Sequence, residues 1–346
     1  MRQSLKIAFT LLISLVVSGV FTVLAFSNLF SAIETSVYLP NLKNRAVAGT
    51  EKTASRMITY HDLTVSRYRE ITASGFMWRA YLANQSQEDI ALRANAMASL
   101  MQGNSRIMAV RLVDLTGRRI NYSTVDGDIE PGSDVYRITY SNLDRVEPEA
   151  SVDRFVLAEK EDYRIVWDDT KQRIIYVMPV VDPDKTRRGV ALFYVQARDL
   201  ESYLSADTGV AFRDLYVAGN AGALCDVSGI VAGLDETDIS VFTSAVKGAF
   251  ESSSSEIRTE AFRVGDAGQK LYLFFKNTGV GGVVGILFGS SNFEMGLADK
   301  IIILLIFYSL VFLVILLVLN IKQEPMVVVA GRMKKFQNDF VAEFVD

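Results

Sequence analysis

Two long stretches of the sequence contain no charged residue, and they constrain the fold more than any other feature. They cover residues 7–33 and 301–321. Each one is long enough to supply the roughly 20 apolar residues that an α-helix needs to cross a bilayer. We therefore expect a leader and first transmembrane helix within residues 1–27, and a second transmembrane helix at residues 300–321.

The first apolar stretch also has features of a cleavable signal peptide. Arg2 and Lys6 form a basic leader, and Val23, Leu24 and Ala25 resemble a small-residue cleavage site. However, the stretch is longer than the roughly 7 to 15 residues of a signal-peptide core, which favours an uncleaved anchor.

Basic residues lie before the first stretch and after the second, and they indicate how the chain is oriented in the membrane. Arg2 and Lys6 precede the first stretch, and the second is followed by Lys322, Arg332, Lys334 and Lys335. Positively charged flanks usually stay in the cytoplasm. We expect a two-pass protein of the cytoplasmic (inner) membrane with both termini inside, so that residues of about 28–299 lie in the periplasm or outside the cell.

Composition argues against several classes of function. The net charge is −4, and residues 28–299 contain no cluster of basic residues, so nucleic acid is not expected as a partner. Cys225 is the only cysteine, which excludes an intrachain disulfide and is typical of a buried free thiol. One histidine, His61, leaves too few ligands for a metal site, and we expect it to be a solvated or interfacial helix residue. No catalytic motif is present, so we expect neither an enzyme nor a cofactor.

Residues 28–106 carry helical patterns. We expect this helical region to be broken near Pro40 and again around Gly75 or Asn84. Ser86 and Asp89 form a capping box at the start of the last helix. Its apolar face is expected to contain Ile90, Ala94, Met97 and Met101. This region is predicted to be a long membrane-proximal helix followed by a helical hairpin.

The pattern changes to β-strands at Ile107. Residues 107–123 form two apolar runs around a Thr116-Gly117 turn, which is typical of a hairpin. A less regular stretch follows, and then three further strands are predicted at residues 163–167, 173–181 and 189–196. A short helix follows them. We assign residues 107–205 to one membrane-distal module.

The same order of elements recurs in residues 206–299, although the residues themselves differ. Strand, turn and strand are followed by a helix, and then by three strands separated by Gly-rich turns. The fold class that we predict is therefore α+β, with two transmembrane helices flanking a long N-terminal helix and two tandem antiparallel-sheet modules.

This organisation resembles the double Cache (tandem PAS-like) sensory domain of bacterial transmembrane receptors. The likeness rests on "VRLVDLTGRRINYS" and "IIYVMPVVDPDKTRRGVALFYV" and covers roughly residues 28–300. Domains of this family occur on chemoreceptors, sensor kinases and cyclases, and the distal module usually holds a small molecule. The amino-acid-binding version carries Arg-x-Trp-Tyr, whereas this chain has "DYRIVWDD", so that specificity is not carried over.

Candidate ligand contacts come from the first module alone. An arginine can clamp a carboxylate through two hydrogen bonds, and tyrosines combine apolar area with a hydroxyl. In a regular strand, Arg164 and Trp167 point to opposite faces, and Trp167 also suits a plain core position. The predicted ligand-binding residues are Tyr136, Arg137, Tyr140, Arg164, Trp167, Tyr176 and Asp182.

Residues 322–346 carry a further helical pattern. Met326, Val329, Met333, Phe336 and Phe340 recur at spacings of three and four after a proline. The pattern resembles the first helix of a HAMP linker, which packs against its copy in a dimer. An amphipathic helix on the inner membrane surface is the alternative, and Lys334 and Lys335 favour it.

The sequence thus predicts a homodimeric membrane sensor whose outer domain binds a small solute or a ligand-loaded solute-binding protein. Its signal would pass through the second transmembrane helix to a cytoplasmic partner in trans or to an output domain missing from this chain. The alternative is a structural or interaction protein whose outer domain binds another envelope protein.

Overall fold

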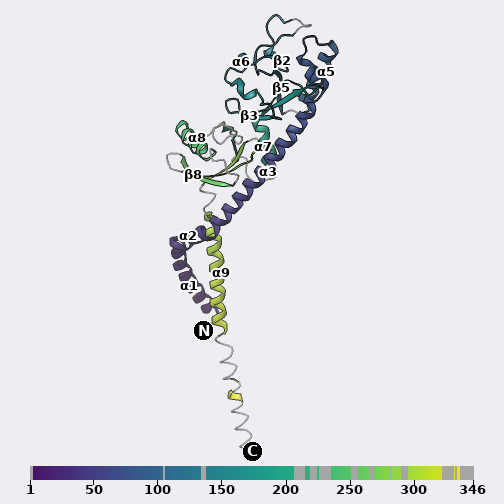
Figure 1. Ribbon diagram of the computed structural model, residues 1–346. Helices are drawn as coiled ribbons and strands as arrows, with labels where there is room; N and C mark the ends of the chain where they lie inside the picture. Colours follow the sequence, from purple (N-terminus) through teal and green to yellow (C-terminus); the bar gives the residue numbers. More distant parts are fainter. Residues whose placement is uncertain are drawn as a thin grey trace, which may run out of the picture. The chain divides into compact units, whose positions relative to one another are not determined.

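The computed structural model describes residues 3–103, 106–133, 138–205, 215–218, 224–225, 235–250, 256–264, 269–280, 282–289, 295–321, 331 and 333–335. The chain divides into two compact units (Figure 1). One contains Met1–Lys43 and Ser291–Asp346, and the other contains Asn44–Ser290.

The first unit contains both apolar stretches as helices. Its elements are α1 (Gln3–Leu24), a π-helical segment (Ala25–Leu29), α2 (Phe30–Ile33), a second π-helical segment (Glu34–Tyr38) and α9 (Leu297–Ile321). Phe21 of α1 stacks on Phe307 of α9 with ring centroids 3.6 Å apart. Both helices are long and apolar enough to cross a membrane, and few of their side chains are buried within the protein.

The expected break near Pro40 is not a break. Helix α3 (Leu39–Thr72) includes Pro40 close to its start, directly after the π-helical segment Glu34–Tyr38. Proline has no N–H to donate to the preceding turn, and it is tolerated in the first turn of a helix, where that donor has no partner. The second expected irregularity is confirmed, because α3 ends at Thr72 and a new short helix, α4 (Gly75–Trp78), begins at Gly75.

The second unit holds two antiparallel sheets of the same design. The first contains β1 (Ile107–Asp114), β2 (Ile120–Ser123), β3 (Arg164–Asp168), β4 (Arg173–Val181) and β5 (Arg187–Gln196) in the order β2-β1-β5-β4-β3. The other contains β6 (Leu215–Ala218), β7 (Leu224–Cys225), β8 (Arg258–Val264), β9 (Gln269–Asn277) and β10 (Val283–Gly289) in the order β7-β6-β10-β9-β8. The identical order confirms the predicted repeat of sheet modules in an α+β fold.

Helices and short turns of helix fill the connections of the second unit. Before the first sheet lie a 3-10 turn (Arg79–Tyr81) and α5 (Gln87–Gly103). Between β2 and β3 lie a 3-10 turn (Asp126–Asp128), α6 (Leu143–Val146) and another 3-10 turn (Val152–Phe155). Helix α7 (Ala197–Ser205) follows β5, and α8 (Glu236–Phe250) separates β7 from β8.

The two faces of the first sheet are covered differently. Side chains alternate between faces along a strand, so neighbouring residues of β4 pack into separate cores. One face, which we call the helix face, packs against α3, α4, α5 and α7 through residues such as Met57, Tyr68 and Leu200. The other, which we call the loop face, is covered by the segment between β2 and β3 through residues such as Leu143 and Phe155.

The predicted helix at residues 322–346 lies almost wholly outside the described residues. Within it, Gly331 and residues 333–335 are helical.

Candidate functional site

The loop face carries two buried arginines in strands that are otherwise apolar. Arg111 lies in β1 between Val110 and Leu112, and Arg173 begins β4. Because β1 and β4 both pair with β5, the two arginines flank Tyr194 of that central strand. The guanidinium carbons lie over the Tyr194 ring, 4.8 Å from its centroid for Arg111 and 4.7 Å for Arg173. Stacking on an aromatic face is favourable for a guanidinium.

Each arginine is oriented by an acidic residue of its own. Arg111 donates Nε to Asp128 Oδ2 at 2.6 Å and Nη2 to Asp128 Oδ1 at 3.0 Å, which is a bidentate pair. Arg173 donates Nε to Asp168 Oδ2 at 2.7 Å. These contacts orient both guanidinium groups and leave Nη1 of Arg111 and Nη2 of Arg173 for a third partner.

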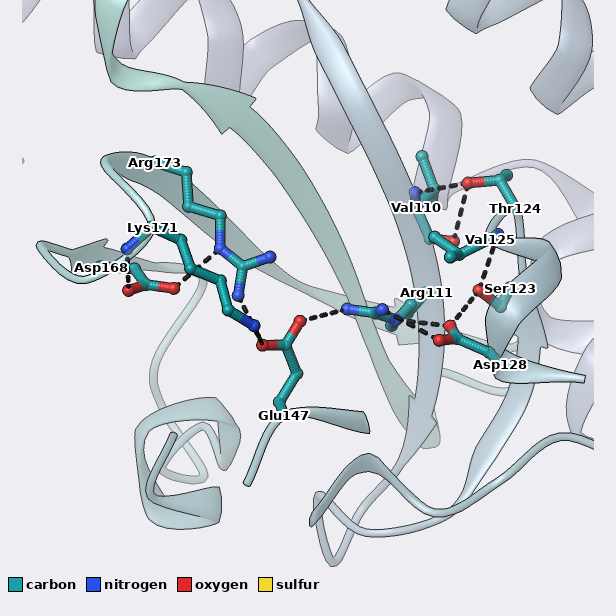
Figure 2. Close-up of polar contacts among 10 residues, drawn as sticks. All are labelled: Val110, Arg111, Ser123, Thr124, Val125, Asp128, Glu147, Asp168, Lys171 and Arg173. Carbon is teal, nitrogen blue, oxygen red and sulfur yellow. Dashed lines mark hydrogen bonds and ion pairs between the residues drawn. The ribbon is translucent and has the colours of Figure 1, made fainter. Parts of the chain in front are cut away.

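That third partner is Glu147, which comes from the covering segment directly after α6. Figure 2 shows its carboxylate between the two arginines. Oε1 accepts from Arg111 Nη1 at 2.6 Å, and Oε2 accepts from Arg173 Nη2 and from Lys171 Nζ, both at 2.6 Å. Burial raises the pKa of Glu147, but its bonds to Arg173, Lys171 and Arg111 outweigh that effect and lower the pKa to about 2.

We call Arg111, Asp128, Glu147, Asp168, Lys171 and Arg173 the charge cluster. A cluster of this kind is expensive to bury and is tolerated only when every charge is paired. The cluster joins strands β1 and β4 of the first sheet to the segment that covers the loop face.

The predicted ligand-binding residues are not all brought together. Tyr136 and Arg137 lie outside the described residues. Tyr140 lies in the covering segment, where its backbone pairs with Ile129 and its ring is 6.3 Å from that of Tyr122. Arg164 contacts the same segment, since it pairs with Glu161 and donates to backbone carbonyls of residues 153 and 154.

The other predicted residues belong to the opposite side of the sheet or to a turn. Trp167 and Tyr176 lie in the core of the helix face and are fully buried. Asp182 directly follows β4, where it accepts from the Thr186 N–H at 2.9 Å and from Arg188 Nε at 2.7 Å. The covered loop face therefore receives Tyr140 and Arg164, but not Trp167 or Tyr176.

The expectation that His61 is solvated or interfacial is wrong. His61 of α3 is 0% exposed, and its Nδ1 lies 2.8 Å from the Tyr176 hydroxyl of β4. Burial lowers its pKa to about 3, so the imidazole is neutral at physiological pH. Cys225, by contrast, is buried as expected, and its thiol donates to the Asp168 carbonyl at 3.8 Å.

Two open grooves lie on the helix-face side. One, of about 410 Å³, is lined by residues that include Tyr60, Arg67 and Arg106. The other, of about 440 Å³, lies near the end of β4 and includes Trp78, Asp162 and Asp182. Neither groove reaches the charge cluster.

Sequence comparison identifies one family and one relative. The pattern of the TP_0593_N family, described as an N-terminal domain, matches residues 38–292. An uncharacterized protein of Treponema pallidum (strain Nichols) is 20% identical over 315 residues, which cover 89% of this chain and 44% of that protein. The chain thus spans less than half the length of this curated relative.

Among solved structures, sensor domains of bacterial receptors resemble this chain at low sequence identity. The ligand-binding domain of Campylobacter jejuni chemoreceptor Tlp3 in complex with 4-methylisoleucine is 13% identical, covers 77% of this chain and 98% of its own, and has a TM-score of 0.48. The same domain in complex with L-valine is 14% identical, covers 76% of this chain and 98% of its own, and has a TM-score of 0.44.

Proposed function

We propose that this chain, which belongs to the TP_0593_N family, is a membrane-anchored sensor with a double Cache-like outer domain. Its ligand would be a small solute bound on the loop face of the first sheet. One observation carries this proposal: a charge-balanced cluster, whose arginines and Glu147 are buried, lies between the first sheet and an irregular covering segment. Charges so arranged are costly for stability alone, and they suit a site that recognises a polar solute. No catalytic role is part of the proposal.

The sheet offers a short route from this face to helix α3. Arg173 and Tyr176 lie three residues apart in β4 and point to opposite faces, one into the charge cluster and the other towards His61. A shift of β4 on solute binding would therefore change the packing of α3. For such a shift to signal, the solute must bind the two arrangements with different affinity, and a coupling of about 1 to 3 kcal/mol is typical.

Membrane attachment in this proposal rests on α1 and α9. Both are long and apolar enough to span a bilayer, and basic residues flank them. An orientation with both termini in the cytoplasm would place the sheet modules outside it. The output would then pass to a cytoplasmic partner or to a domain beyond this chain.

Thermal unfolding of the full chain in detergent micelles tests the proposal. A panel of organic acids, amino acids, sugars and polyamines is added at increasing concentration. A solute present at 100 times its Kd should stabilise the folded state by about 2.7 kcal/mol. A panel without any concentration-dependent stabilisation would contradict solute sensing and favour an outer domain that binds another envelope protein.

A further inference from the structure

We infer that Arg111, Lys171 and Arg173 form a clamp for the carboxylate of a small ligand, and that Glu147 is its exchangeable internal occupant. This inference deepens the proposed function by naming the chemical class of the solute. It rests on how three cationic groups meet a single carboxylate in the charge cluster (Figure 2).

The clamp is preorganised without Glu147. Asp128 holds Arg111 through two hydrogen bonds, and Asp168 holds Arg173 through one. The stacking of both guanidinium groups on Tyr194 restricts them further. Their free nitrogens therefore stay aimed at the same point whichever carboxylate lies there, which is the arrangement that carboxylate recognition requires.

Charge balance defines what the clamp accepts. Arg111, Lys171 and Arg173 are matched by Asp128, Asp168 and Glu147, so departure of Glu147 leaves one uncompensated positive charge. An unpaired charge in a buried site is strongly unfavourable, so the vacated clamp favours an anion. Two guanidinium nitrogens at 2.6 Å from different oxygens of one carboxylate fit a planar, two-oxygen group.

Two features make exchange feasible. Glu147 comes from the covering segment, where its backbone is held through Leu143 of the four-residue helix α6, whereas the arginines come from central strands. In addition, the Lys171 side chain is 40% exposed, which opens the clamp to solvent on one side. The Tyr194 hydroxyl is buried and lies beside Arg111.

The internal carboxylate competes with any ligand. A group tethered by a short segment acts at an effective concentration in the millimolar range, so its removal strengthens binding of an external carboxylate. Glu147→Ala removes the equivalent of acetate from the clamp. We expect acetate to bind the Glu147→Ala chain at least tenfold more tightly than the wild-type chain.

The experiment titrates the full chain in detergent micelles with sodium acetate and follows the unfolding temperature. Acetamide, which has the same shape without the charge, and sodium chloride at equal ionic strength are the reference probes. The expected result is a saturable increase with acetate alone in Glu147→Ala. Equal responses to acetate and acetamide, or equal responses of Glu147→Ala and wild type, would overturn the inference.

Two variants serve as controls. Glu149→Ala alters an exposed carboxylate of the same segment and should respond to acetate like the wild type. Glu147→Ala combined with Arg173→Met should lose the acetate response, because the clamp then lacks one arm. A double variant that keeps the full response would place acetate elsewhere and contradict the inference.

A measurement on the wild type covers the case in which Glu147→Ala does not fold. Acetate at saturating concentration should accelerate hydrogen exchange of the Glu147 amide, which donates to the Leu143 carbonyl at 2.8 Å, whereas acetamide should not. Unchanged exchange contradicts displacement of Glu147. If the acetate test fails while a solute of the panel still stabilises the wild type, the clamp is contradicted and the proposed sensor is not. If no panel solute stabilises the wild type while Glu147→Ala responds to acetate but not to acetamide, solute sensing is contradicted and the clamp is not.

Discussion

The Tyr176 hydroxyl lies 2.8 Å from Nδ1 of His61 and joins strand β4 to helix α3 inside the core of the helix face. Tyr176 also packs edge-on against Tyr68, whose ring stacks on Phe193 of β5 at 4.1 Å. These contacts fix α3 against the two central strands of the sheet. Within the proposed sensor, they are the contacts through which a movement of β4 would reach the long helix.

Tyr176→Phe should destabilise the protein by about 1 to 3 kcal/mol. The substitution leaves Nδ1 of the buried His61 without its partner, and an unsatisfied buried polar group carries most of that cost. Chemical denaturation at pH 7.5 measures the change.

The double variant His61→Phe/Tyr176→Phe is the control for that prediction. Because it removes both polar groups, it should be less destabilised than the sum of the two single variants. Additive effects would show that the two groups do not stabilise each other.

Burial of His61 makes stability depend on pH. Its pKa is about 3 in the folded protein, against 6.5 as the ordinary value, so the unfolded chain binds more protons between these pH values. The contribution is therefore complete above pH 6.5 and is lost as the pH falls towards 3. We expect the free energy of unfolding to fall by about 1 kcal/mol between pH 6 and pH 5 from this residue.

His61→Gln tests that dependence, since glutamine can bond to Tyr176 but does not titrate. The variant should show a flatter dependence of unfolding free energy on pH between 6 and 5. A slope equal to that of the wild type would mean that His61 is accessible to protons in the folded state.

Glu147 contributes a separate dependence at lower pH. Its pKa is lowered from 4.5 to about 2, so its contribution is full above pH 4.5 and disappears as the pH falls towards 2. That contribution is about 3 kcal/mol at neutral pH. Glu147→Gln should remove it, and denaturation curves at pH 7 and pH 3 should then differ less than in the wild type. Glu149→Gln, at an exposed position, should keep the wild-type difference.

Gly189 allows two strands and a tyrosine to approach closely. A Cβ at this position would overlap the Tyr81 ring and the Val113 carbonyl oxygen, while the Tyr81 hydroxyl donates to the Val113 and Val190 carbonyls, both at 3.1 Å. Gly189→Ala should therefore cost more than about 2 kcal/mol, as overpacking does. Gly127→Ala, where a Cβ meets no atom within 4 Å, should change stability by less than about 0.5 kcal/mol. Similar effects of the two substitutions would contradict the close approach.

The strands of both sheets could be predicted from the sequence because apolar runs and Gly-containing turns are local signals. Strand β4 was predicted at residues 173–181 and has those bounds, and Gly117 has φ +72° in the predicted turn. The capping contact from the Asp89 N–H to Ser86 Oγ, at 3.1 Å, was equally readable. Each of these features is set by residues within a few positions of one another.

The charge cluster and the His61 pair could not be predicted in the same way. Glu147 is 36 residues from Arg111, in a segment without periodicity, and His61 is 115 residues from Tyr176. The predicted apolar face of α5 is correct at Met97, which is buried, but wrong at Ala94, which is exposed, while Arg93 is buried and donates to the Phe76 carbonyl. The one available signal was the presence of Arg111 within the apolar run "AVRLV", where a charge requires a buried partner.

Hydrogen exchange of the full chain in micelles tests the central claim most directly, with and without the panel solute that stabilises it most. A solute bound on the loop face should change exchange in residues 138–157 of the covering segment and, through β4, in α3 near His61. Changes confined to β8, β9 and β10, or no change in either region, would contradict a sensor whose solute site lies on the loop face of the first sheet.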